Sequence, residues 1–241
     1  MGRGIQGGNK IMFNMKEYPR GGVMNGDVVN RTEMHVPCVV LLDTSSSMAC
    51  VKDQLERGLD TLVNSLSDQA KGCVEFCIIS FDDEARIISP FAPVYDFETP
   101  AIDCDGMTAM HAAVKLGLSE IEARKNQYKQ EHVPYYRPWI FMLTDGGAND
   151  SDNGEFDELL QSQKDCHCTF FPVGIGEDAD IGLLKTLRED GLVLKASKEN
   201  FVGAFEWLSN SMSRVSDSKG EKTAKLASPG NYQLDVEVDV M

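Results

Sequence analysis

The chain has 241 residues, enough for one domain with a full hydrophobic core, and 42% of them are hydrophobic, as in ordinary globular proteins. Its formal net charge is −15, from 38 acidic and 23 basic residues. Nucleic acids and anionic membrane surfaces attract clustered lysine and arginine, so this charge argues against both as partners and fits a protein kept soluble in a cytoplasm.

The seven cysteines are an odd number and favour free thiols in a reducing compartment over a disulfide framework. We find neither a signal peptide nor an apolar run of about 18 residues, and we therefore expect a cytoplasmic protein. The segment Cys166-His167-Cys168 could suggest zinc. However, the chain has no C-x-x-C partner pair, and neighbouring residues of a strand point to opposite faces, so no zinc site is expected.

Residues 1–32 are rich in glycine without sustained periodicity, which predicts a flexible N-terminal arm. A single domain is expected over residues 33–218, followed by a loosely patterned tail, 219–241, with strand character at 232–238.

Within this domain, strands alternate with helices. The apolar patterns predict strands at 35–43, 73–81, 85–91, 139–144, 167–176 and 191–196, and helices at 51–66, 109–130, 155–164, 181–189 and 201–216. The third strand follows the second so closely that it should pair with it antiparallel. This order predicts an α/β, Rossmann-like fold, doubly wound, with a mostly parallel six-stranded sheet, one antiparallel edge strand and helices on both faces.

Three segments carry oxygen-bearing side chains at places where ligands bind in such sheets. Asp43 ends the first strand, and Ser45 and Ser47 follow it. Thr108 precedes a helix, and Asp145 ends the strand at 139–144. Taken singly, the D-x-S-x-S segment fits a polar helix-capping turn as well as a metal site, Thr108 fits a helix N-cap better, and Asp145 fits a turn that ends a strand. In the doubly wound order, however, the first strand neighbours the strand at 139–144, so the three segments should meet at one crevice.

With these segments the chain resembles the von Willebrand factor A (VWA) domain family. That family's metal-ion-dependent adhesion site combines D-x-S-x-S, a later threonine, and an aspartate after an apolar strand. The matching residues here are Asp43, Ser45, Ser47, Thr108 and Asp145, and the resemblance covers residues 35–216. The chain is more narrowly similar to the bacterial TerY-like, tellurium-resistance branch, through segments 39–48, 79–82, 108–110, 137–146, 173–180 and 205–209.

The chain departs from the family pattern at three positions. Ser46, Met107 and His111 stand where the family commonly has glycine. Met107 and His111 bear on the position of Thr108 and on the shape of the rim. His111 is interpreted as a rim or packing residue, because Mg²⁺ prefers oxygen ligands. The acidic pair Asp82-Asp83 and the loop 149–152 are interpreted as solvated loops, with a role in the rim as the alternative.

The resemblance implies a site for Mg²⁺, with Mn²⁺ or Ca²⁺ as substitutes, held directly or through water. Two aspartates balance the charge of the ion and leave a coordination position open, which an Asp or Glu of a partner protein can fill. It therefore implies a non-enzymatic interaction module. The TerY-like similarity adds a bacterial stress or chemical-resistance system that includes kinase- or phosphatase-like proteins.

Two alternatives remain. The first is a metal-dependent hydrolase or phosphotransferase with Asp43 as nucleophile; the aspartate-phosphatase pattern, however, needs a second aspartate where Ser45 stands, and no histidine lies in a motif where it could act as a base. The second is a scaffold that no longer binds metal, which the complete set of donor residues argues against. The sequence leaves the partner, the pathway and the oligomeric state open.

Overall fold

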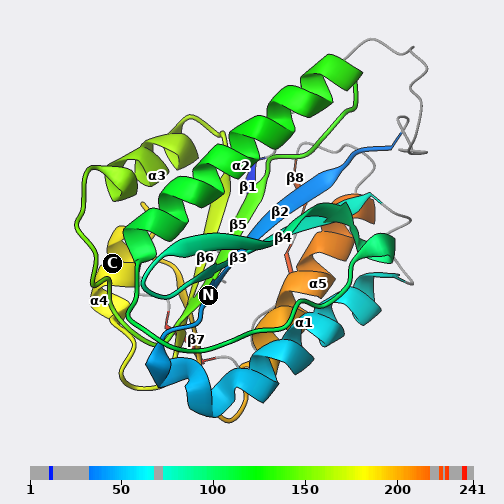
Figure 1. The fold of residues 1–241 in the computed structure, drawn as a ribbon. Helices are drawn as coiled ribbons and strands as arrows, with labels where there is room; N and C mark the ends of the chain where they lie inside the picture. Colours follow the sequence, from blue (N-terminus) through cyan, green and yellow to red (C-terminus); the bar gives the residue numbers. More distant parts are fainter. Residues whose placement is uncertain are drawn as a thin grey trace, which may run out of the picture.

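The computed structural model describes residues 11–12, 33–67, 73–217, 223–224, 226–227 and 235–237. Its main sheet consists of β2 (Val36–Asp43), β3 (Val74–Phe81), β4 (Ala85–Pro93), β5 (Trp139–Thr144), β6 (Thr169–Ile175), β7 (Val193–Ala196) and β9 (Asp235–Glu237). The strand order is β4-β3-β2-β5-β6-β7-β9 (Figure 1). β2 lies near the middle and pairs in parallel with both β3 and β5.

The predicted fold class is confirmed. The expected strands form the sheet, and β4 is its antiparallel edge, paired with β3. A seventh strand, β9, pairs antiparallel with β7 and forms the other edge strand, within the tail segment 232–238 that was predicted to have strand character. It covers an edge of β7 that would otherwise present unpaired backbone groups.

A second, two-stranded sheet pairs β1 (Ile11–Met12) antiparallel with β8 (Thr223–Ala224). The rest of the predicted arm, 1–32, and most of the tail, 219–241, lie outside the described residues. The boundaries of the predicted 33–218 domain therefore stay a prediction.

Helices cover both faces of the main sheet. They are η1 (Ser46–Val51), α1 (Lys52–Ser67), η2 (Val94–Asp96), α2 (Met110–Glu131), α3 (Glu155–Lys164), α4 (Ile181–Thr186) and α5 (Val202–Asp217). Figure 1 shows α1 and α5 on one face, with α2 and α3 on the other. The first predicted helix, 51–66, is α1, and the short 3-10 helix η1, which contains Ser46 and Ser47, directly precedes it.

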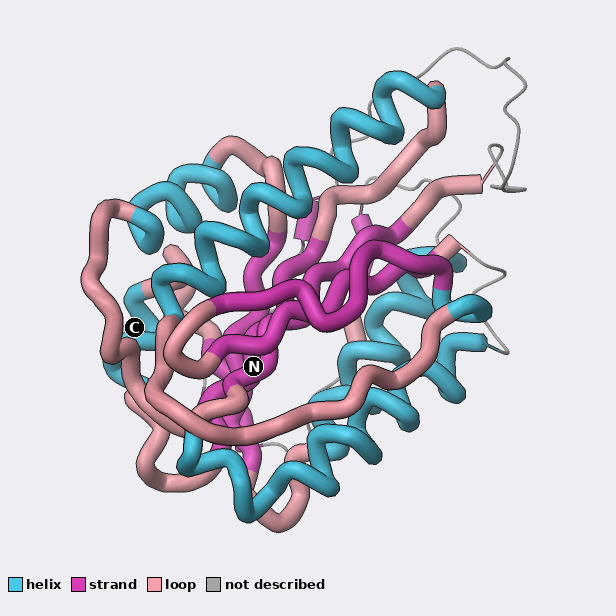
Figure 2. Tube along the Cα trace, in the orientation of Figure 1, coloured by secondary structure: helices cyan, strands magenta, loops and turns pink. Residues whose placement is uncertain are grey.

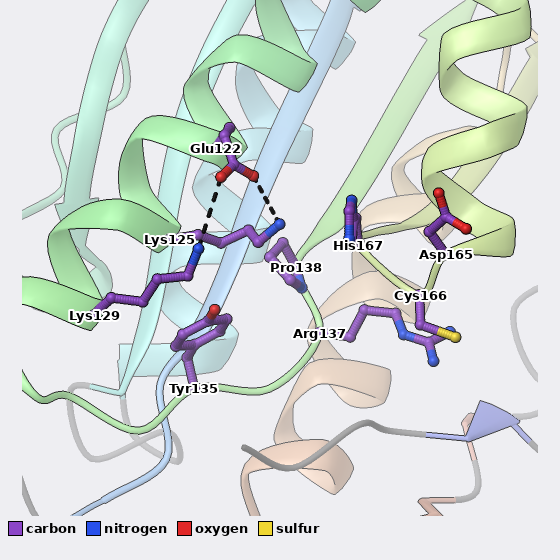
Figure 3. Close-up of a pocket in the computed structure, with 9 residues that line it drawn as sticks. All are labelled: Glu122, Lys125, Lys129, Tyr135, Arg137, Pro138, Asp165, Cys166 and His167. Carbon is purple, nitrogen blue, oxygen red and sulfur yellow. Dashed lines mark hydrogen bonds and ion pairs between the residues drawn. The ribbon is translucent and has the colours of Figure 1, made fainter. Parts of the chain in front are cut away.

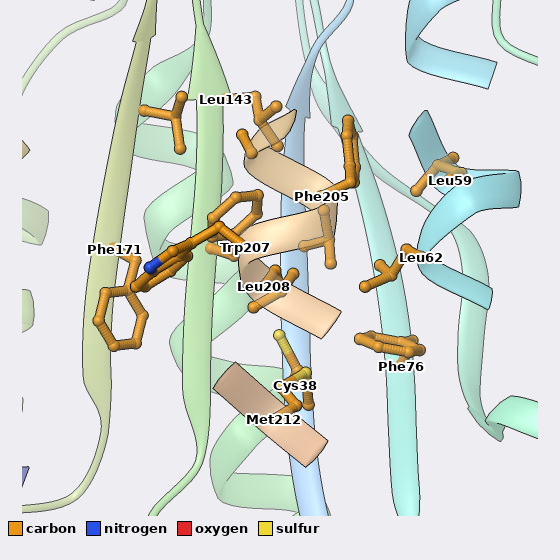
Figure 4. Close-up of a cluster of buried hydrophobic side chains, with 14 of the residues drawn as sticks. Cys38, Leu59, Leu62, Phe76, Leu143, Phe171, Phe205, Trp207, Leu208 and Met212 are labelled. Carbon is orange, nitrogen blue, oxygen red and sulfur yellow. The ribbon is translucent and has the colours of Figure 1, made fainter. Parts of the chain in front are cut away.

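The core under α1 and α5 joins the two amphipathic helices to the sheet. The predicted stripe of α5 is buried, and Figure 4 shows Phe205, Leu208 and Met212 among the side chains of the strands. Every residue of β2 and β3 is buried, as expected for strands covered on both faces. The helices α1 and α5 pack closely at Gly58, where an added Cβ would lie 2.3 Å from the Phe205 ring.

The other face has its own core, in which α2 lies on the central strands. Val114 and Ile121 of α2 pack with Leu41 and Ile79, and Leu159 of α3 joins them. No helix in the described part of the chain is long and apolar enough to span a membrane. All seven cysteines lie among the described residues, and each is a free thiol.

Candidate functional site

The carboxyl ends of β2 and β5 lie side by side, and they bring the first pair of polar side chains together. Leu42 and Leu143 are register partners, so the next residues, Asp43 and Thr144, are neighbours at the end of the sheet. Thr144 Oγ1 donates a hydrogen bond of 2.5 Å to Asp43 Oδ2. Both side chains are fully buried.

A chain of short contacts connects Asp43 to Asp145 through the two serines. The backbone N–H of Ser45 donates to Asp43 Oδ1 at 2.9 Å. The hydroxyl oxygens of Ser45 and Ser47 lie 3.1 Å apart. Ser47 Oγ in turn donates to Asp145 Oδ1 at 2.6 Å. Two aspartates and two serines, from the end of β2 and the segments that follow β2 and β5, thus form one continuous cluster.

Thr108 reaches the same edge of the sheet from a long loop. This loop follows η2 and runs along α1 (Figure 2), where Lys52 Nζ donates to Asp103 Oδ1 at 3.1 Å. The loop is then tied to the first segment, because Ser46 N donates to Gly106 O at 3.1 Å. Thr108 is buried, and a Cβ built on Gly146 would lie 3.8 Å from Thr108 Oγ1. Thr108 therefore lies next to the turn that follows Asp145.

Two acidic residues that the sequence interpretation left as solvated loops hold the Thr108 segment in place. Asp83 Oδ1 accepts a hydrogen bond of 2.9 Å from Met107 N. Its carboxylate lies under Gly106, whose φ of +74° and missing side chain permit this approach; an added Cβ would lie 2.8 Å from Asp83 Cγ. No local sequence signal distinguishes Asp83 from an ordinary loop acid.

Asp150 caps the first turn of α2, which begins two residues after Thr108. Its carboxylate accepts hydrogen bonds from the backbone N–H groups of His111 (3.1 Å) and Ala112 (2.9 Å), which have no partner within the helix. His111 also places Nδ1 2.8 Å from Asp150 Oδ1 and stacks on Phe156 at 4.0 Å between ring centroids. His111 is thus the packing residue that the sequence suggested.

The electrostatics of the site are those of two close carboxylates with one cation beside them. Burial raises the pKa of Asp43, and the charge of Asp145 adds to this, while the hydrogen bonds from Ser45 and Thr144 act in the opposite direction. Lys198 Nζ donates to Asp145 Oδ2 at 2.8 Å. This hydrogen bond raises the pKa of Lys198. The sequence interpretation identified neither Thr144 nor Lys198.

The side chains present suit a hard divalent cation. The donor set consists of carboxylate and hydroxyl oxygens, which Mg²⁺, Mn²⁺ and Ca²⁺ accept and which soft metals do not prefer. No group of three or more His, Cys, Asp or Glu residues that could hold a metal occurs among the residues the structure describes. In the Cys166–Cys168 segment, Cys168 Sγ lies 3.3 Å from Ser162 Oγ.

A cavity of about 210 Å³ lies at the opposite end of the strands, where β5 and β6 begin (Figure 3). Two of its lysines face one carboxylate: Glu122 pairs with Lys125 at 2.8 Å and with Lys129 at 3.7 Å. These charges are already largely balanced within the cavity. It is separate from the cluster around Asp43.

Comparison with known proteins places the fold. No protein-family model matches the sequence, and a search of the curated proteins gives no match. Among solved structures, the chain is similar to a von Willebrand factor type A protein from Catenulispora acidiphila, with a TM-score of 0.57 and 17% identity over 75% of this chain and 43% of that one. It is also similar to the vWF domain of the type V pili tip protein Mfa5 from Porphyromonas gingivalis, with a TM-score of 0.57 and 12% identity over 75% of this chain and 95% of that domain.

A third similar structure is proximal thread matrix protein 1 from the mussel byssus with a zinc-occupied MIDAS motif. Its TM-score is 0.51, with 19% identity over 74% of this chain and 46% of that one. The chain spans less than half the length of this protein and of the Catenulispora protein. At these identities the likeness concerns the fold, and this chain has the fold of von Willebrand factor A domains.

Proposed function

We propose that this protein is a non-enzymatic interaction module that binds Mg²⁺ through Asp43, Ser45, Ser47, Thr108 and Asp145 and uses the ion to dock an acidic side chain of a partner protein. The observation that carries the proposal is the hydrogen-bonded chain from Asp43 through Ser45 and Ser47 to Asp145, which gathers hard oxygen donors from two strand ends. Proteins of the same fold include one with a metal-occupied MIDAS motif and one from a pilus tip.

Charge balance supports docking of a carboxylate. Asp43 and Asp145 neutralise one divalent ion, and the serine and threonine hydroxyls add no charge. An ion bound in this way keeps Lewis acidity, and Mg²⁺ retains several waters that an incoming Asp or Glu can replace. A protein with a net charge of −15 has few other means of attracting an acidic partner.

The rim next to the donor set offers an apolar contact. Met107 directly precedes Thr108, and 57% of its surface is exposed. A methionine at this place suits a partner segment that has an apolar residue near its Asp or Glu, because its flexible thioether adapts to different shapes. The partner we propose is therefore a protein with an exposed acidic residue flanked by apolar side chains.

The TerY-like resemblance gives the proposal its biological setting. We propose a cytoplasmic role in a bacterial stress or chemical-resistance system of the tellurium type, with kinase- or phosphatase-like proteins as partners. This setting rests on the sequence resemblance alone.

The enzyme alternative would need Asp43 as a nucleophile. Both of its carboxylate oxygens accept hydrogen bonds, one from Ser45 N and one from Thr144 Oγ1, and the side chain is fully buried. Accepted hydrogen bonds and burial make this carboxylate a weaker nucleophile than an exposed one, whereas the remaining lone pair of each oxygen can still orient a metal ion or its bound water.

The proposal is tested by titrating the protein with Mg²⁺ in a calorimeter, together with Asp43→Ala and Asp103→Ala. Asp103 is a fully exposed acid on the loop that carries Thr108, outside the donor set, and serves as the matched control. Wild type and Asp103→Ala should bind Mg²⁺, and Asp43→Ala should not. Absence of divalent-ion binding by wild type would refute the metal site.

The docking step is then tested by affinity capture from a native lysate, with Mg²⁺ or with EDTA. Capture of a partner should require the ion and should be lost with Asp43→Ala. A partner captured equally with EDTA, or by Asp43→Ala, would contradict docking through the metal even if the ion binds. Hydrolysis of phosphate esters that disappears with Asp43→Ala would instead support the enzyme alternative.

A further inference from the structure

Lys198 brings a positive charge directly to the proposed metal site. Lys198 follows β7, so its loop lies at the carboxyl ends of the parallel strands, as do the loops after β2 and β5. Its ammonium lies 2.8 Å from Asp145 Oδ2 and 4.0 Å from Asp178 Oδ2. The Asp145 side chain is only 1% exposed, whereas that of Lys198 is 28% exposed. The lysine therefore reaches from the surface to a buried carboxylate.

The Lys198 side chain passes close to the backbone of Gly176. This glycine is the first residue after β6 and has a φ of +76°, and a Cβ placed on it would lie 3.0 Å from Lys198 Cε and 3.1 Å from Lys198 Cγ. The absence of a side chain at Gly176 thus lets the lysine stem lie across the turn. Because a positive φ favours glycine, the same residue serves the turn and the path of the lysine.

Both oxygens of Asp145 are engaged by donors. Ser47 Oγ donates to Oδ1 and Lys198 Nζ donates to Oδ2. The two aspartates carry a charge of −2, which Lys198 reduces to −1. A divalent ion would make this total +1 with the ammonium in place and 0 with the ammonium removed. Two cations a few ångströms apart repel, so the ion and the ammonium compete for Asp145.

We propose that Lys198 is a tethered cation that occupies Asp145 when no metal is bound, lowers the affinity of the site for divalent ions, and swings away when an ion binds. This rests on the metal site of the proposed function and adds its regulation. The exposed end of the lysine can move into solvent at low cost, since its stem has rotatable bonds and its ammonium is strongly hydrated. Metal binding then replaces the ion pair between Lys198 and Asp145 with an interaction between Asp145 and the metal ion.

The test compares Mg²⁺ dissociation constants, measured by calorimetry at fixed ionic strength, for the full chain and four variants. Lys198→Met and Lys198→Gln remove the charge, and Lys198→Arg keeps it. Lys52→Met removes a positive charge that is paired with Asp103, outside the donor set. We expect Lys198→Met and Lys198→Gln to bind Mg²⁺ about tenfold more tightly than wild type, from the repulsion of a unit and a divalent charge in water at this range. Lys198→Arg and Lys52→Met should stay within about threefold of wild type.

The second measurement is the melting temperature, which also reports on Lys198 when no metal is present. In EDTA, the melting temperature of Lys198→Met should fall, because two close carboxylates lose their cation, and added Mg²⁺ should raise it more than in wild type. Equal Mg²⁺ affinity in wild type, Lys198→Met and Lys198→Gln would overturn the role of Lys198 and leave the metal site standing. Weaker binding by both charge-removing variants would overturn it as well. Absence of Mg²⁺ binding by wild type and by every variant would overturn the proposed function, and the inference with it.

Discussion

At the scale of single residues, the site depends on hydrogen bonds that orient its carboxylates. Thr144 holds Asp43 Oδ2, Ser45 N holds Oδ1, and Ser47 and Lys198 hold Asp145. Groups that orient a ligand contribute to metal affinity without touching the ion, because they fix the direction of its lone pairs.

Replacing Thr144 by valine should weaken Mg²⁺ binding about tenfold, since valine keeps the shape of the side chain but cannot donate to Asp43. Thr144→Ser keeps the hydroxyl and should stay close to wild type. Calorimetric titration with Mg²⁺ measures both. Wild-type affinity in Thr144→Val would show that the bond to Asp43 does not orient a metal ligand.

Another buried carboxylate, Glu75 of β3, lies away from the site and connects β3 with α2 and with His35, the residue before β2. His35 Nδ1 lies 2.9 Å from Glu75 Oε1, while Arg124 Nε and Tyr128 Oη donate to Oε2 at 2.7 Å and 2.5 Å. Burial raises the pKa of Glu75, but the hydrogen bond with His35 and the charge of Arg124 outweigh it and leave the pKa below the usual value. Because the folded pKa is the lower one, this stabilisation is present above the unfolded pKa and is lost as the pH falls through the folded pKa.

Glu75→Gln should lower the free energy of unfolding at pH 7 by about 3 kcal/mol, since it leaves the buried side of Arg124 without its counter-charge. The loss of stability below about pH 4.3 should also become shallower than in wild type. Urea unfolding at several pH values measures both effects. The exposed Glu84→Gln is the control, and a wild-type acid profile in Glu75→Gln would refute the assignment.

At the scale of elements, the packing of α1 on α5 depends on a single small residue. Gly58 lets the Phe205 ring lie directly on the backbone of α1, and a Cβ would be 2.3 Å from Phe205 Cδ2 and Cε2. Phe205 also contacts Phe141 of β5, at 6.2 Å between ring centroids, so a shift of this ring is passed on to the sheet. The close approach is the reason for a glycine inside a helix, where glycine otherwise costs stability.

Gly58→Ala should lower the free energy of unfolding by about 1–3 kcal/mol, because overpacking outweighs the gain in helix propensity. Asn64→Ala changes an exposed position of the same helix and should be neutral or slightly stabilising. Chemical unfolding followed by circular dichroism compares the two. A stabilised Gly58→Ala protein would mean that the helices can separate without cost.

At the scale of the whole molecule, the chain is strongly acidic, and the two ends of its sheet differ. At the carboxyl ends of the strands lie Asp43 and Asp145 with one cation beside them. The cavity at the amino ends contains lysines that are paired with Glu122. A bound divalent ion should therefore act on the stability of the entire fold, since it neutralises charge at the point where β2, β5 and the Thr108 loop meet.

Mg²⁺ at about 100 times its dissociation constant should raise the free energy of unfolding by about 2.7 kcal/mol, because it binds the folded chain and not the unfolded one. Thermal unfolding with Mg²⁺ and with EDTA measures this as a reversible rise in melting temperature. Asp43→Ala should show no rise, whereas Asp103→Ala should behave like wild type. An equal rise in Asp43→Ala would locate the stabilising ion elsewhere.

The sequence by itself determined the main elements and predicted the proposed donor residues, because both predictions rest on local patterns. The strand Trp139–Thr144 and the short helix Glu155–Lys164 were predicted with the bounds observed. The D-x-S-x-S pattern marked Asp43, Ser45 and Ser47 within five residues. The alternation of strands and helices predicted the doubly wound order in which β2 and β5 are neighbours, and their pairing is observed. The structure adds the 3-10 helix η1 before the first predicted helix and extends β4 from the predicted 85–91 to Pro93.

Only the tertiary structure decided which polar groups meet. The bonds of Asp43 with Thr144, of Met107 with Asp83, and of Asp145 with Lys198 join residues 101, 24 and 53 positions apart in the chain. No pattern in the sequence marks such pairs, because a loop lysine or aspartate has the same local neighbours whether it is solvated or anchors a site. The fold brings them into contact by stacking strand ends and loops at one edge, and there burial and distance give these ordinary residues their roles.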